Sequence, residues 1–122
     1  MSVKFIRIDD RLIHGQVVTA WIKNYQAKRV WIVDDGVAKD DFLRSILKMA
    51  APSGIELFIT GTENLEETVK KFDMSEKNTI VLLKTPETAK KLFDAGVAIR
   101  ELNVGGMGSV FYLLFTKTQS TI

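Results

Sequence analysis

Cysteine is absent from this chain of 122 residues, which excludes disulfides and thiolate metal sites. Long apolar runs are missing as well, since the longest, Val110 to Phe115, is far shorter than the roughly 20 residues that span a bilayer. The residues from Val3 onward alternate between polar and apolar and lack the apolar core of a secretion signal. We therefore predict a cytoplasmic protein that does not cross the membrane.

Charge of one sign is not concentrated anywhere in the chain, although its formal net charge is +2 and its pI is about 8.9. The lysine pairs Lys70-Lys71 and Lys90-Lys91 lie on the polar faces of predicted helices. No aromatic residues are interleaved with them to stack on bases, so we predict that nucleic acid is not a partner.

Strand-like apolar runs recur along the chain at nearly regular intervals, and stretches of helical periodicity fill the gaps between them. The runs are Val3–Ile8, Arg29–Val33, Ile55–Thr60, Thr79–Lys84 and Ile99–Val104. This alternation predicts an α/β fold, with an open, mostly parallel, Rossmann-like sheet that has helices on both faces.

Two of the helical stretches carry apolar stripes that we expect to face the core. The first stripe consists of Val17, Val18, Trp21, Ile22 and Tyr25, and the second of Phe42, Leu43, Ile46 and Met49.

Ligands of open parallel sheets bind beyond the carboxyl ends of the strands, so the residues that follow each run are the candidates for a site. They are Asp9, Asp10, Arg11 and His14, then Asp34 and Asp35, then Gly61 and Thr62, then Thr85, and finally Gly105. The first of these segments holds a single glycine, Gly15, so the dinucleotide pattern G-x-G-x-x-G is absent, as is a P-loop. A receiver-like domain would need an aspartate at the end of the third strand, where Thr60 and Gly61 stand.

The only histidine, His14, lies between the first predicted strand and the first predicted helix. Imidazole can accept a phosphoryl group near neutral pH, and a helix N-terminus favours its neutral form and can hold phosphate oxygens. Arg11 would offer a planar charged fork to the phosphoryl group, and Asp10 or Asp9 could orient that fork or fix the histidine tautomer.

Two further residues of this loop could assist. Gly15 would let the backbone approach phosphate closely, and Gln16 could donate an amide hydrogen bond.

Plainer interpretations remain open for each of these residues. His14 could be incidental, and Arg11 could form an ordinary salt bridge with a neighbouring aspartate. Asp34 could belong to a turn, Thr85 could cap a helix and Gly105 could form a turn, although each could also line the rim of the same pocket. No metal site is predicted, because the loop offers no third ligand at a defined spacing.

The segment from Arg7 to Val17, RIDDRLIHGQV, closely resembles the active-site segment of a known family. The family is the IIB component of the mannose/fructose/sorbose family of the phosphoenolpyruvate-dependent sugar phosphotransferase system. The resemblance continues through Val33-Asp34-Asp35, Ala51-Pro52-Ser53-Gly54, Leu83 to Pro86 and Asn103 to Met107, so it covers residues 3–107 in order.

This resemblance implies a phosphocarrier, a protein-Npi-phosphohistidine–sugar phosphotransferase, in the cytoplasm and peripherally associated with a membrane transporter. The histidine matching His14 accepts a phosphoryl group from a phosphohistidine on the IIA component. It then passes that group to a sugar that arrives through the membrane components IIC and IID, while Arg11 stabilises the phosphate. No metal, nucleotide or other cofactor is implied. The identity of the sugar, and whether the carrier forms a homo-oligomer, stay open.

Residues 108–122 depart from the family pattern, so we divide the chain into a IIB-like domain, 1–107, and an atypical C-terminal tail, 108–122. The resemblance then predicts a sheet that lacks its C-terminal elements. Two alternatives to an active carrier follow. One is a non-catalytic, Rossmann-like module that binds an anion or nucleotide on the same rim, and the other is an inactive truncated IIB fragment that associates through Val110–Phe115.

Overall fold

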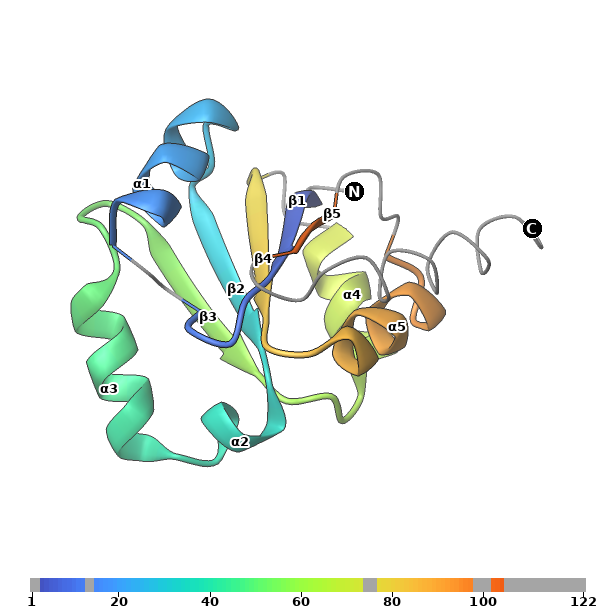
Figure 1. Cartoon of the computed structure of the whole chain (residues 1–122). Coiled ribbons are helices and arrows are strands. Elements are labelled where there is room, and N and C mark those ends of the chain that lie inside the picture. The colour runs from blue at the N-terminus through green and yellow to red at the C-terminus, as the bar shows by residue number, and fades with distance from the viewer. Residues whose placement is uncertain (1–2, 13–14, 74–76, 98–101, 105–122) are drawn as a thin grey trace.

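The fold is built around a five-stranded parallel sheet, seen in a computed structural model that describes residues 3–12, 15–73, 77–97 and 102–104 (Figure 1). The strands are β1 (Val3–Ile8), β2 (Arg29–Val33), β3 (Glu56–Thr60), β4 (Thr79–Leu83) and β5 (Leu102–Val104). The helices are α1 (Gly15–Asn24), α2 (Asp35–Ala38), α3 (Asp41–Ala50), α4 (Leu65–Asp73) and α5 (Pro86–Asp94). None of these helices is long and apolar enough to cross a bilayer.

The strand order β3-β2-β4-β1-β5 explains why helices cover both faces of the sheet. From β1 the chain moves outward to β2 and β3, and it then returns to β4 and β5 in the opposite direction. Because crossovers between parallel strands are right-handed, this reversal puts α1 and α3 on one face and α4 and α5 on the other (Figure 1). The predicted α/β fold with helices on both faces is confirmed.

Two core clusters lie on the two faces of the sheet, and the strands supply alternate residues to them because strand side chains point to opposite faces. In β1, Phe5 joins the cluster under α1 and α3, whereas Ile6 and Ile8 join the cluster under α4 and α5. Strands β2 and β4 are buried along their whole length. These two strands therefore read as continuous apolar runs, as parallel strands covered on both faces do.

The apolar stripe of α1 faces the core as predicted, within the part of it that the structure describes. Val18 is buried, and the rings of Trp21 and Tyr25 stack on Phe5 with centroids 4.5 and 5.0 Å away. These ring contacts fix α1 against β1, close to the loop that joins the two elements.

The prediction for α3 is wrong in most of its residues. Leu47 is buried and Leu43 half-buried, but Phe42, Ile46 and Met49 are 75%, 44% and 85% exposed. Six of the ten residues of α3 are apolar, so its apolar arc is wider than the strip of sheet that it covers. The side that carries Leu43 and Leu47 takes the core, and the remainder of the arc turns outward.

Strand boundaries shift by a residue or so from those predicted, as helix and strand ends commonly do. The third strand begins at Glu56, and the fourth ends at Leu83. The fifth is described over Leu102–Val104, and its predicted start at Ile99 lies outside the described part of the chain.

Candidate functional site

A tight turn follows β1 and sets the geometry of the site. The Asp9 N–H donates to the carbonyl of Leu83 at 2.8 Å, which extends the pairing of β1 with β4, and the Leu12 N–H donates back to the Asp9 carbonyl at 3.0 Å. Leu12 has a φ of 55°, a left-handed conformation that branched and bulky residues seldom adopt. Its side chain is only 3% exposed, so burial in the cluster under α1 holds the turn in this conformation.

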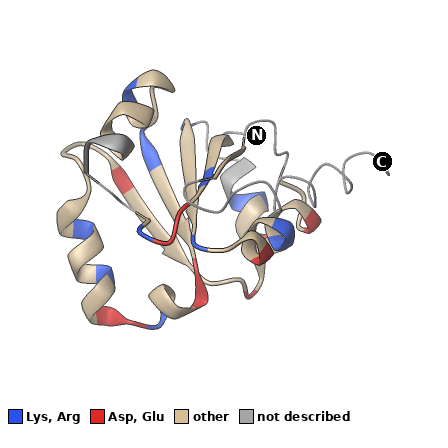
Figure 2. Ribbon diagram, viewed as in Figure 1, with Lys and Arg blue, Asp and Glu red and all other residues tan. Residues whose placement is uncertain are grey.

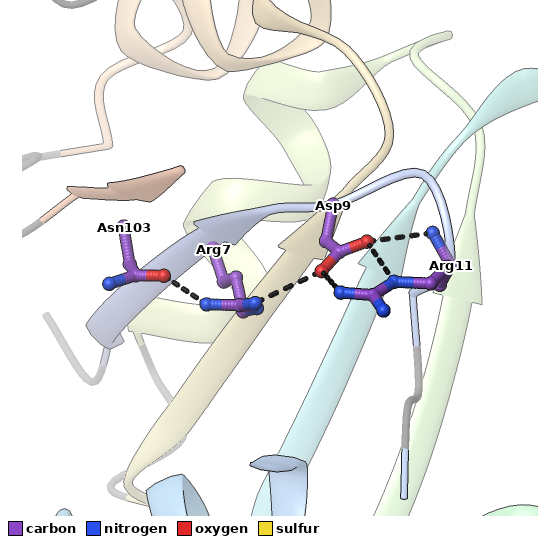
Figure 3. A network of polar contacts seen from close by, with 4 residues as sticks. All are labelled: Arg7, Asp9, Arg11 and Asn103. Atoms are coloured by element: carbon purple, nitrogen blue, oxygen red, sulfur yellow. Dashed lines mark hydrogen bonds and ion pairs between the residues drawn. The ribbon is translucent and has the colours of Figure 1, made fainter. Parts of the chain in front are cut away.

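The carboxylate of Asp9 is the centre of a polar network in this turn (Figure 3). Arg11 donates to it from Nε and Nη2 at 3.0 and 2.9 Å, and from its backbone N–H at 3.0 Å. Arg7 donates from Nη2 at 3.0 Å. The Asp9 side chain is 3% exposed, against 11% for Arg7 and 53% for Arg11. One buried carboxylate therefore holds two guanidinium groups, the outer of which reaches the surface.

These contacts shift the pKa of both Asp9 and Arg11 in the direction that favours the charged form. The side-chain hydrogen bond from Arg11 is the largest cause that lowers the pKa of Asp9, and it acts with the Arg11 backbone and Arg7 against the opposing effect of burial. The hydrogen bond to Asp9 in turn raises the pKa of Arg11, and the charge of Asp10 contributes in the same direction. Two arginines and one aspartate leave one positive charge in excess, which suits an anion.

Strand β5 supplies the fourth member of the network. Arg7 and Asn103 are register partners in the parallel pairing of β1 with β5, and Arg7 Nη1 donates to Asn103 Oδ1. Neither residue was predicted from the sequence to belong to the site. The signal for Arg7 was available, since a cation between two apolar residues of a strand, Ile6 and Ile8, needs a partner when that strand is buried. The partner itself depended on knowing that β1 and β5 are neighbours.

Two aspartates follow β2, and they have different local roles. Asp34 caps the short helix α2, accepting from the Val37 N–H at 3.0 Å. The Asp35 carboxylate accepts from the Thr62 N–H at 2.6 Å and from the Thr62 hydroxyl at 2.9 and 3.0 Å. The hydrogen bond from the Thr62 backbone is the main reason that the pKa of Asp35 is lowered. Asp35 thus ties the end of β2 to the end of β3.

Some of the remaining predicted residues are described by the structure, and the others lie outside the described residues. Thr85 caps α5, accepting from the Thr88 N–H at 3.4 Å, so the helix-cap interpretation describes its contacts. Asp10 is exposed, and Gly15 begins α1. His14, Gly105 and the side chain of Gln16 lie outside the described residues. Within residues 3–12, 15–73, 77–97 and 102–104, no three acidic or histidine side chains are grouped to hold a metal ion.

The arrangement places a fixed cationic group at the carboxyl end of β1, just before the N-terminus of α1. Strand β1 lies inside the sheet, where the carboxyl ends of parallel strands and a helix N-terminus together favour an anionic ligand. Because Asp9 already holds Arg11 in place, an arriving anion would meet a preorganised guanidinium. The chemistry that fits is recognition or transfer of a phosphate-like group.

Comparison with known proteins gives one consistent family. The family model described as "PTS system sorbose subfamily IIB component" matches residues 3–114. The fructose-specific EIIB component of Bacillus subtilis strain 168 is 33% identical over 107 residues, which are 88% of this chain and 66% of that protein. The sorbose-specific EIIB component of Lacticaseibacillus casei is 36% identical over 107 residues, covering 88% of this chain and 65% of that protein.

Solved structures agree with these sequence matches. The IIB domain of the sorbose permease from Klebsiella pneumoniae superposes with a TM-score of 0.80 at 35% identity, over 88% of this chain and 66% of that one. The N-acetylgalactosamine-specific IIB component 1 from Escherichia coli gives a TM-score of 0.78 at 30% identity, over 87% of this chain and 69% of that one. The chain spans just under two thirds of the length of the fructose- and sorbose-specific relatives.

Proposed function

The chain belongs to the sorbose subfamily of IIB components of the phosphotransferase system, and we propose from this membership that it is a phosphocarrier. In the proposed reaction His14 accepts a phosphoryl group from a phosphohistidine of a IIA component. It then transfers the group to a sugar delivered by the membrane components IIC and IID. The carrier would work in the cytoplasm, at the surface of that transporter.

The observation that carries the proposal is the clamp of Asp9 on Arg11. Asp9 holds the guanidinium through Nε and Nη2 and the Arg11 backbone through its N–H. The Arg11 side chain is still 53% exposed. It stands in the same short loop as His14, immediately before α1. Phosphoryl transfer depends mainly on positioning and on neutralising charge on the transferred oxygens, and a cation fixed in advance supplies both without reorganising during the reaction.

The proposed transfer balances in two steps. In the first, the P–N bond to the IIA histidine breaks while a P–N bond to His14 forms, in line with the leaving nitrogen. In the second, that bond breaks and its electron pair returns to the imidazole, while a sugar hydroxyl oxygen forms a P–O bond and the hydroxyl proton restores the neutral imidazole. Arg11 would contact the equatorial phosphoryl oxygens in both steps, and the N-terminus of α1 would add backbone N–H groups.

Asp9, Arg7 and Asn103 would act through Arg11 rather than on the phosphoryl group. Asp9 sets the direction of the Arg11 fork, and Arg7 holds the second carboxylate oxygen from the other side. Asn103 fixes Arg7 in turn. Nothing in this transfer requires a second copy of the chain, so a homo-oligomer is not part of the proposed reaction.

A phosphorylation assay tests the proposal. The purified chain is incubated with labelled phosphoenolpyruvate and the upstream carriers, and alkali-stable, acid-labile label is measured on wild type, His14→Ala and Lys90→Ala. We expect labelling of wild type and of Lys90→Ala, whose substitution lies on α5, and none of His14→Ala. Label that persists in His14→Ala would exclude His14 as the acceptor, and an unlabelled wild type would favour the inactive-fragment alternative.

A further inference from the structure

An apolar stripe on the outer side of α3 packs on neither core cluster. Its members are Phe42, Ile46 and Met49, which are 75%, 44% and 85% exposed. Neither cluster includes them, although each includes other large side chains of the helices that cover it. Spacings of four and three residues put the three side chains in one row along the helix. Single apolar side chains are common on protein surfaces, whereas a contiguous row of large ones marks an interaction site.

Charges of opposite sign border this stripe at its two ends. Asp41 begins α3 and Lys48 lies near its end. The two residues are seven positions apart, so they lie about 20° from each other around the helix, on the side of the stripe away from the core. Figure 2 shows the same order, with acidic residues at the start of α3 and basic residues farther along it.

We infer that α3 pairs with α3 of a second copy of this chain, antiparallel, about a twofold axis near Ile46. This arrangement sets Phe42 against Met49 of the other copy and brings the two Ile46 side chains together. It also places Asp41 within reach of Lys48 of the other copy, and the symmetry repeats both contacts. Asp41 already accepts from Arg44 of its own helix at 3.2 Å, and its exposed carboxylate takes the lysine in addition.

The pattern of charge favours a second copy over a lipid surface. A helix that lies on an anionic membrane is bordered by cations, whereas this stripe has an acid at one end and a base at the other. An antiparallel copy matches both ends at once. The contact is small against the roughly 800 Å² per partner of a stable interface, so the dimer is weak, with a dissociation constant on the order of micromolar to millimolar.

Sedimentation velocity of the full chain, from about 10 μM to about 1 mM, tests the dimer. We expect the sedimentation coefficient of wild type to rise with concentration. The Ile46→Asp chain should stay monomeric, because the twofold axis places two carboxylates face to face. Ser53→Asp adds the same charge at an exposed position outside α3 and should behave as wild type. A monomeric wild type, or association that survives Ile46→Asp, would overturn the inference.

A charge exchange tests the antiparallel pairing independently of folding. Lys48→Glu and Asp41→Lys each put like charges together in their own homodimer, so each should weaken self-association by about tenfold. An equimolar mixture of the two variants restores both attractive pairs and should associate about as tightly as wild type. Circular dichroism of each variant checks that α3 is retained. If the mixture associates no better than the separate variants, the antiparallel arrangement is wrong.

Discussion

Replacing Asp9 by asparagine should destabilise the protein more than any other single change in the loop after β1. The substitution preserves the size of the side chain but removes the charge between Arg7 and Arg11, and it turns an amide N–H toward a guanidinium. Removing one partner of a buried ion pair lowers the free energy of unfolding by about 3–5 kcal/mol. The Arg7 side chain is 11% exposed, so the loss of its ion pair contributes fully to this cost. The Arg11 side chain is 53% exposed, so the loss of its ion pair contributes little. We expect a loss of about 3 kcal/mol at pH 7.

Urea unfolding followed by circular dichroism measures this loss, and Asp10→Asn is the matched control. Asp10 is exposed, so its substitution should change the free energy of unfolding by less than about 0.5 kcal/mol. In the double variant Arg7→Met/Asp9→Asn the loss should be smaller than the sum of the single losses by at least about 0.5 kcal/mol, because the buried cation is gone. If Asp9→Asn loses less than about 1 kcal/mol, the clamp does not hold the loop.

The pH dependence gives a second measurement of the same clamp. The pKa of Asp9 is lower in the folded than in the unfolded chain, so its contribution is complete above the unfolded value, about 3.9, and is lost as the pH falls toward the folded value. At pH 3 the unfolded carboxyl is largely protonated while the folded one is still ionised. The gap between wild type and Asp9→Asn should therefore narrow by about 1 kcal/mol from pH 7 to pH 3. A gap that stays constant would contradict the depressed pKa.

Three other changes test neighbouring parts of the molecule. Arg11→Lys should slow phosphoryl transfer from the IIA component by about 10²-fold in rapid-quench labelling, because lysine cannot present a planar fork; an unchanged rate would remove Arg11 from the mechanism. Gly61→Ala should cost about 1–2 kcal/mol in a thermal melt, since its Cβ would lie 2.7 Å from Asp35 Oδ1, and the cost should vanish when Asp35 is also alanine. Asp40→Ala removes a 3.0 Å N-cap bond and should cost about 1 kcal/mol, more than Thr85→Ala, whose bond is 3.4 Å. Equal costs for the two caps would show that bond length does not govern them.

The strands of the fold were predictable because their signals are local. The runs at Val3–Ile8 and Arg29–Val33 match the observed strands in full, since a buried parallel strand is a continuous apolar segment between turn residues. The outward side of α3 was not predictable in the same way. Periodicity shows which residues share a side of a helix, but how much of that side meets the sheet depends on where the helix lies. Phe42 and Met49 illustrate that difference.

Only part of the candidate site could likewise be predicted from the sequence. Arg11 and the neighbouring aspartates could be proposed from the loop itself, because they are adjacent in the sequence. The choice of Asp9 rather than Asp10 as the buried carboxylate depends on which residue turns inward at the end of β1. Arg7 and Asn103 are 96 residues apart, and only the strand order brings them together. Contacts between residues that are adjacent in the sequence could thus be predicted from it, whereas contacts that depend on the pairing of distant strands could not.

The pairing of Arg7 with Asn103 also has a consequence for the order of events during synthesis. Asn103 belongs to β5, the last strand in the described part of the chain, while Arg7 and Asp9 are made among the first residues. A nascent chain can therefore fold the loop after β1 against β4 only with Arg7 still missing one of its two described partners. The guanidinium network would become complete when β5 docks, so a chain released before that strand would emerge with this network unfinished.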